Sequence, residues 1–108
     1  MVDHELVPDL AEFVQEMRAA GIVVAVAVPG GGVLGEFDAV VDSDAPGAHK
    51  PTREFFARAC AAVGRPPVRC LFVDADDRSV RGARVAGLSA YRWNSTADLR
   101  YLRAALGQ

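Results

Sequence analysis

The chain has 108 residues, of which 51% are hydrophobic and 24% charged, and its formal net charge is −2. This length fits a single domain with one core, and the charge excludes the basic footprint of a nucleic-acid-binding protein. No apolar run reaches membrane-spanning length, and the first residues carry no apolar signal segment, so we expect a cytoplasmic protein without membrane contact. The two cysteines, Cys60 and Cys70, lack metal-ligand spacing and are interpreted as reduced thiols in the core.

The first half of the chain predicts one helix and two strands. Residues 8–20 carry apolar side chains at helical spacing and end at a glycine, which indicates an amphipathic helix. The valine-rich run Ile22–Val28 is typical of a parallel strand buried on both faces. A glycine turn follows it, and a short helix or turn is expected over Gly32–Glu36. Phe37–Val41 predicts a second strand, and residues 42–49 a polar loop.

The second half alternates helices and strands. Glycines or prolines close two of its helices, and an acidic or hydroxyl residue caps the start of the last two. Strands that alternate with helices favour a doubly wound parallel sheet in one domain spanning residues 1–108. The expected elements are a helix from Pro51 to Gly64, a strand Val68–Val73, a short helix capped by Asp76 or Asp77 and closed by Gly87, a strand Leu88–Trp93, and a last helix capped by Ser95 with Asp98.

Several polar residues fall where phosphate-ester chemistry would need them. The carboxyl ends of parallel strands collect the groups of a site, and a lysine and carboxylates suit phosphate and Mg²⁺. Each residue also has a simpler interpretation, as a solvated lysine, a capping aspartate or a flexible turn. The candidates are Lys50, Gly30 and Gly31 for phosphate, and Asp74, Asp76 and Asp77 for a metal.

The segment from His49 to Gly87, HKPTREFFARACAAVGRPPVRCLFVDADDRSVRGARVAG, is the most specific pattern in the chain. It resembles the C-terminal part of the core domain of haloacid dehalogenase-like (HAD) phosphohydrolases. Lys50-Pro51 matches the family's lysine, Asp74 matches the first acid of an LFVDD-like strand, and Ser43 lies in a matching segment. The resemblance implies a three-layer, Rossmann-like domain without a cap, and Mg²⁺ as cofactor if the site is functional.

Departures from the family pattern argue against catalysis. The family nucleophile belongs to a DxDxT-like motif, and Asp3 and Glu5 have other residues after them and no apolar strand before them. Val28 stands where the family has a hydroxyl residue, and Ala75 replaces the second acid. We therefore expect a degenerate HAD-like protein that acts by binding or assembly, with vestigial Lys50 and Asp74. The alternatives are part of a split or upstream-truncated phosphohydrolase that depends on Mg²⁺, and a small-anion-binding module.

Without a nucleophile strand, the predicted sheet has four strands. An unfilled gap at its centre would leave backbone groups buried and unpaired. Because the printed chain starts at Met1, we expect the sheet to close up in the order 2-1-3-4, numbered along the chain. A partner chain that completes the sheet, or a reading frame that extends upstream, are the alternatives. A homodimer is also expected to be possible, through the sheet edges.

Overall fold

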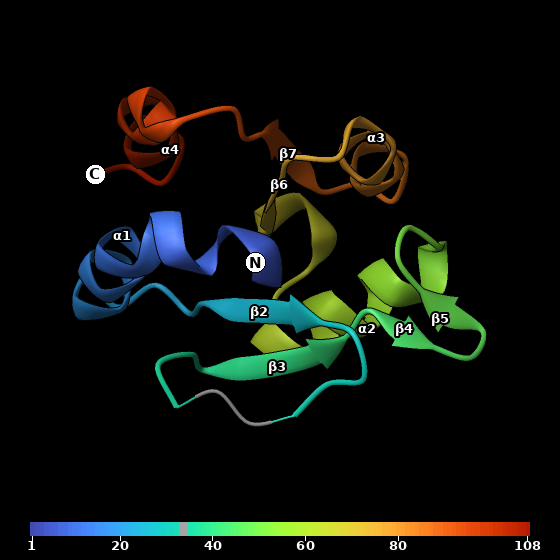
Figure 1. The fold of residues 1–108 in the computed structure, drawn as a ribbon. Coiled ribbons are helices and arrows are strands. Elements are labelled where there is room, and N and C mark those ends of the chain that lie inside the picture. Colours follow the sequence, from blue (N-terminus) through green and yellow to red (C-terminus); the bar gives the residue numbers. More distant parts are fainter. Residues whose placement is uncertain (33–34) are drawn as a thin grey trace.

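A parallel β-sheet of five strands forms the centre of the molecule in a computed structural model, which describes residues 1–32 and 35–108 (Figure 1). The strand order is β3-β2-β1-β6-β7, and every pair in this sheet is parallel. The strands are β1 (Val2–Asp3), β2 (Ala25–Val28), β3 (Ala39–Asp42), β6 (Leu71–Asp74) and β7 (Ser89–Arg92).

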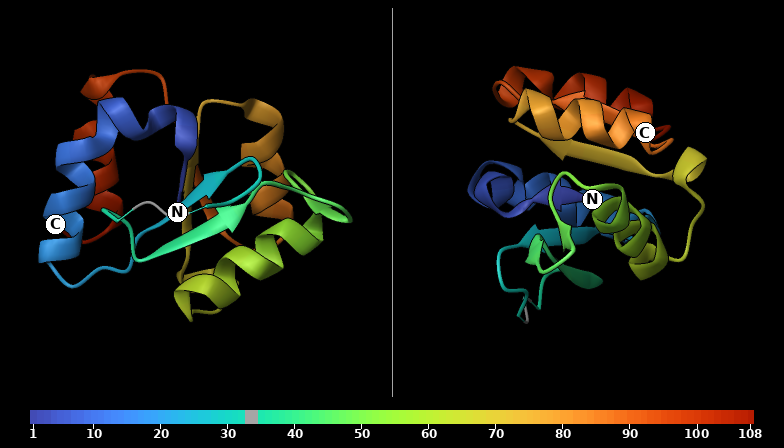
Figure 2. Two further views of the ribbon diagram at one scale, coloured as in Figure 1. Left: turned by 60° about the horizontal axis from the view of Figure 1, so that its bottom comes forward. Right: turned by 90° about the vertical axis from the view of Figure 1, so that its right-hand side faces the viewer.

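Helices cover both faces of the sheet and give the three layers that the sequence predicted (Figure 2). Helices α1 (Val7–Ala19) and α4 (Leu99–Ala105) share a core cluster with the valines Val24 and Val26, whereas α2 (Arg53–Val63) and α3 (Asp77–Val85) pack with the alternate alanines. Successive strand residues point to opposite faces, so one apolar run supplies both clusters. Within the described residues there is no second domain that could serve as a cap.

The central strand corrects the predicted sheet of four strands. Val2 pairs with Val26 on one side and with Val73 on the other, and Asp3 pairs with Ala27. The backbone of Met1 continues this ladder, because its nitrogen donates to the Leu71 carbonyl at 2.6 Å and its carbonyl accepts from Val73 at 2.9 Å. The order 2-1-3-4 is therefore wrong at its centre, where residues of the same chain fill the expected gap.

Local differences follow from tertiary pairing. Residues Ile22–Val24 and Val68 do not join the strands predicted for them, and 3-10 helix η2 (Pro67–Arg69) occupies the latter region. The predicted polar loop contains an antiparallel hairpin, β4 (Asp44–Ala45) and β5 (Ala48–His49). The turn expected over Gly32–Glu36 includes residues 33–34, which lie outside the described residues.

The predicted helices are otherwise present. Asp76 caps α3, and Ser95 with Asp98 forms a capping box at 3-10 helix η3 (Thr96–Asp98), which leads into α4. Among the described residues, no helix is both long and apolar enough to cross a membrane.

Candidate active site

Asp3 lies at the carboxyl end of the central strand, with only 3% of its surface exposed. The chain turns into 3-10 helix η1 (His4–Leu6) directly after it, and the Asp3 side chain caps this turn by accepting from the Glu5 nitrogen at 3.1 Å. Strand β1 is paired on both sides through Val2, and Asp3 pairs with Ala27, so the carboxylate projects from the middle of the sheet edge.

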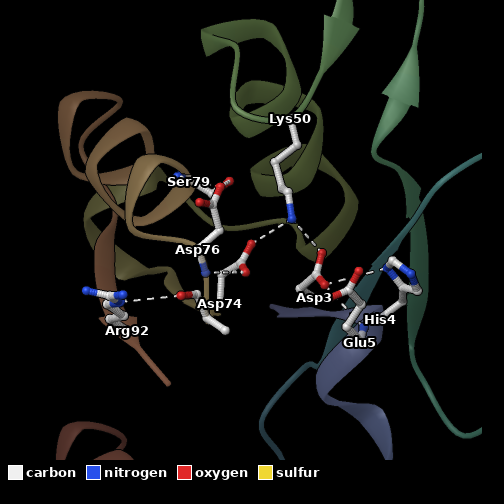
Figure 3. A network of polar contacts seen from close by, with 9 residues as sticks. Asp3, His4, Glu5, Lys50, Asp74, Asp76, Ser79 and Arg92 are labelled. Atoms are coloured by element: carbon white, nitrogen blue, oxygen red, sulfur yellow. Dashed lines mark hydrogen bonds and ion pairs between the residues drawn. The ribbon is translucent and has the colours of Figure 1, made fainter. Parts of the chain in front are cut away.

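Lys50 joins Asp3 to the next strand (Figure 3). Its Nζ donates to Asp3 Oδ1 and to Asp74 Oδ2, each at 2.7 Å. Burial lowers the pKa of the Lys50 ammonium. Its hydrogen bonds to the two carboxylates, together with their charges, raise the pKa by more than burial lowers it, so the net pKa lies above the usual 10.5. Lys50 is therefore charged, and it bridges two strands.

Asp74 is the second buried carboxylate, 3% exposed at the end of β6. Its Oδ1 accepts from the Asp76 nitrogen at 3.0 Å, which leaves Oδ2 for Lys50. The other two predicted metal ligands have different partners. Asp76 accepts from the nitrogen and hydroxyl of Ser79, which hold its pKa below the usual range together with the α3 backbone, and Asp77 pairs with Arg81 in the exposed first turns of α3.

The glycine turn after β2 lies at the same sheet edge, but its amides have partners. Gly30 donates its N–H to Asp42 Oδ1 at 2.8 Å, and Gly31 donates to the Val28 carbonyl at 2.9 Å. The structure thus brings Lys50 and Asp74 together, while the Gly30 and Gly31 amides are engaged in the turn itself.

Two residues beside Asp3 were missing from the predicted site. His4 Nδ1 lies 3.6 Å from Asp3 Oδ2, and it is buried without a hydrogen-bond partner among the described residues. Glu5 is exposed at the start of the turn. A two-residue strand has no periodicity in the sequence, so only the family position of an acid before an apolar helix could have indicated Asp3.

The charges of the site suit a divalent cation. Two buried carboxylates face one ammonium, which leaves one negative charge at a largely buried edge. Carboxylate oxygens are the ligands Mg²⁺ prefers, and Mg²⁺ often takes only one or two of them, with water and phosphate completing its shell. Among the described residues, no three acidic, histidine or cysteine side chains form a metal cluster. Asp3 and Asp74 are the two buried carboxylates that could hold a Mg²⁺ ion at this edge.

Comparison with known proteins agrees with this geometry. The family described as haloacid dehalogenase-like hydrolase matches residues 1–87, which include β1 and Asp3 as well as Lys50 and Asp74. The match covers most of the chain, so the protein belongs to the HAD-like hydrolase family. No curated protein matches the sequence.

Solved structures share the fold at low sequence identity. An uncharacterized protein from Corynebacterium glutamicum superimposes with a TM-score of 0.81 at 24% identity, over 97% of this chain and 90% of that one. A β-phosphoglucomutase from Clostridium difficile gives 0.73 at 14% identity, over 92% and 55%. A HAD-family enzyme from Bacteroides thetaiotaomicron, in complex with magnesium and inorganic phosphate, gives 0.66 at 17% identity, over 85% and 55%. The chain thus spans about half the length of the two named enzymes.

Proposed function

We propose that the protein is a Mg²⁺-dependent phosphohydrolase in which the Asp3 carboxylate is the nucleophile. The observation that carries this proposal is the position of Asp3, at the end of the central strand and joined through Lys50 to Asp74. This arrangement supplies three elements of the family reaction: an attacking carboxylate, a second carboxylate for the metal, and a lysine. The Bacteroides relative, whose structure holds magnesium and phosphate, supports the same ligand class.

Each residue has a defined role in this reaction. Asp3 attacks phosphorus and forms an acyl phosphate as the ester oxygen leaves, and water then hydrolyses that intermediate. The Lys50 ammonium, held between the two strands, offsets charge on the phosphoryl oxygens. Mg²⁺ held by Asp3 and Asp74 would neutralise the remaining charge on those oxygens. We assign protonation of the leaving oxygen to the exposed Glu5, at the same edge as Asp3.

Hydrolysis of an aryl phosphate with Mg²⁺ tests this proposal. The wild-type protein is expected to turn over, and Asp3→Asn to lose turnover altogether, since a missing covalent nucleophile removes the mechanism. Asp77→Asn is the matched control, because it removes a nearby carboxylate whose partner is the exposed Arg81. An Asp3→Asn variant with wild-type turnover, or no turnover by the wild type, overturns the proposal.

A second candidate function is binding without turnover, as the sequence analysis favoured. Val28 has no hydroxyl group to offer the site, and Pro29 has no backbone N–H. Ala75 stands next to Asp74 where the family pattern has a second acid. Lys50 already has two partners, so the site is satisfied without substrate. Heat released or absorbed on mixing with inorganic phosphate and Mg²⁺, measured by calorimetry, would favour this function if no ester tested is hydrolysed.

The protein could also assemble as a homodimer through the edge strands β3 and β7. Sedimentation analysis of the purified protein tests this possibility.

A further inference from the structure

The central strand stops short of its two neighbours at the end of the sheet opposite Lys50. The Val24 and Cys70 carbonyls, which precede β2 and β6, still accept backbone hydrogen bonds from the outer sides of the sheet, at 2.8 and 3.0 Å. In the register of the sheet, Val24 and Leu71 both lie beside the position that would precede Met1. The described part of the chain places no strand between them, so the sheet has a gap one strand wide.

A cavity of about 570 Å³ occupies this gap. Two backbone segments form its sides, and one helix on each layer of the molecule forms its faces: residues 22–24 and 69–71, Val14 and Met17 of α1, and Ala59 and Val63 of α2. A strand buried between two helical layers has the same surroundings, because its successive side chains point to opposite layers. The cavity therefore fits an extended segment with apolar side chains on both faces.

Backbone groups on both sides face the gap. The Leu71 carbonyl accepts from the Met1 amine, and the Val73 N–H donates to the Met1 carbonyl, so the Leu71 N–H faces the carbonyl position two residues before Met1. On the other side Val24 bonds outward, so its neighbours Val23 and Ala25 face inward. Val23 makes no backbone hydrogen bond to any described residue. A segment in line with β1 would pair with these groups.

The charges around the cavity favour an anion. Its charged side chains are Arg65 and Arg69, which are exposed at the outer end, and the described lining holds no carboxylate. Neither arginine pairs with a described acidic side chain. Met1 closes the inner end. Burial lowers the pKa of its amine to about 6, so the amine is largely neutral at pH 7, and a carboxylate against it would favour the ammonium form.

We propose that this cavity binds the carboxyl-terminal segment of a partner protein as an added strand in line with β1. The segment runs parallel to its neighbours, because this direction brings its terminal carboxylate to the Met1 amine and the Ala25 N–H. Its last side chain points to the α1 layer, as Val2 does, and the one before it to the α2 layer. Both are apolar, and acidic residues before them meet Arg65 and Arg69. This binding does not depend on phosphoryl chemistry at the other end of the sheet.

Fluorescence anisotropy with a labelled peptide tests the proposal. The probe is the hexapeptide EETLIV with a free carboxyl end, labelled at its amino end and titrated with the folded protein at pH 7. We expect saturable binding and slower hydrogen exchange of the Leu71 and Ala25 amides in the complex. The same peptide with a carboxyl-terminal amide should bind about tenfold more weakly, because it loses a charge-assisted hydrogen bond.

Two controls test strand pairing. Proline as the last residue, in EETLIP, removes the N–H that would donate to the Val23 carbonyl, so this peptide should bind at least about tenfold more weakly. Protein acetylated at the Met1 nitrogen should not bind EETLIV, because the acetyl group takes the place of the last peptide carbonyl.

A third control tests the arginines at the outer end of the cavity. Arg65→Gln combined with Arg69→Gln should weaken binding of EETLIV. Arg58→Gln should not, because Arg58 is exposed on α2 and does not line the cavity.

Several results would overturn the proposal. They are no binding at millimolar EETLIV, equal affinity for the amidated peptide, and binding by the acetylated protein. Undiminished binding of EETLIP would mean that the cavity takes apolar anions without forming a strand. Self-association that the peptide does not reverse would mean that a second copy of the chain fills the cavity. The peptide comparisons use the wild-type protein, so they do not depend on the folding of a variant.

Discussion

Two partly buried amines lie at opposite ends of the central strand, and their pKa values move in opposite directions. Lys50 Nζ meets Asp3 and Asp74 at the carboxyl end, and its pKa is raised above 10.5. The Met1 α-amine, at the amino end, donates to the Leu71 carbonyl, and its burial lowers its pKa from 8.0 to about 6. Burial lowers both pKa values, so the presence of carboxylate partners decides the sign. The same sheet therefore stabilises a cation at one edge and penalises it at the other.

The largest effect is expected from Lys50→Met. This change leaves Asp3 and Asp74 buried and facing each other without the ammonium, and removing one partner of a buried ion pair costs about 3–5 kcal/mol. Urea unfolding at pH 7 measures the free energy of unfolding. Arg58→Met is the control, because its pair with Glu54 is exposed on α2 and contributes below about 1 kcal/mol.

The same variants also test whether the charges of the carboxylates cause the loss. In an Asp3→Asn and Asp74→Asn background, Lys50→Met should cost much less, because no buried carboxylate is left unpaired. An equal loss in both backgrounds would mean that Lys50 acts through its packing and would contradict the role of the ion pair.

At the other end of the strand, the Met1 amine predicts that the free energy of unfolding depends on pH. The folded protein binds the proton of the Met1 amine less tightly than the unfolded chain, so this contribution to stability is present above pH 8 and is lost as the pH falls toward 6. Two pKa units correspond to about 3 kcal/mol. About 2 kcal/mol of this is expected between pH 8 and pH 6, because the amine is half-titrated in the unfolded chain at pH 8 and in the folded protein near pH 6, and unfolding in urea at these two pH values measures the loss.

Protein acetylated at the Met1 nitrogen is the control for this pH dependence. Acetylation removes the amine that titrates and leaves the side chains of both proteins the same, so the difference between them isolates the amine. If the two proteins lost the same stability between pH 8 and pH 6, the buried amine would not be the cause.

Some parts of the fold and of the site could be predicted from the sequence, and others could not. Periodicity identified α1, and the family pattern placed Lys50 and Asp74 correctly at one edge of a parallel sheet, because long helices and buried runs leave local signals. Asp3 left none. Its strand has two residues, and it exists because β2 and β6 pair with it from both sides, which is a tertiary property. The hairpin β4–β5 was missed for the same reason, since each strand has only two residues.

The smallest effect concerns how α2 and α3 meet behind the ion pair. A Cβ on Gly82 would lie 3.0 Å from the Pro51 carbonyl oxygen and 3.3 Å from the Phe56 ring. Gly82→Ala should therefore push α3 away from the segment that carries Lys50, and overpacking of this kind costs about 1–3 kcal/mol, partly offset by the better helix propensity of alanine. Gly35→Ala is the matched control, because its Cβ would meet nothing within 4 Å and its φ is ordinary. Urea unfolding should show a loss for Gly82→Ala alone. Equal stability of the two variants would mean that the contact between the helices yields freely, and that the rigidity of the site comes from the strand pairing and the ion pair.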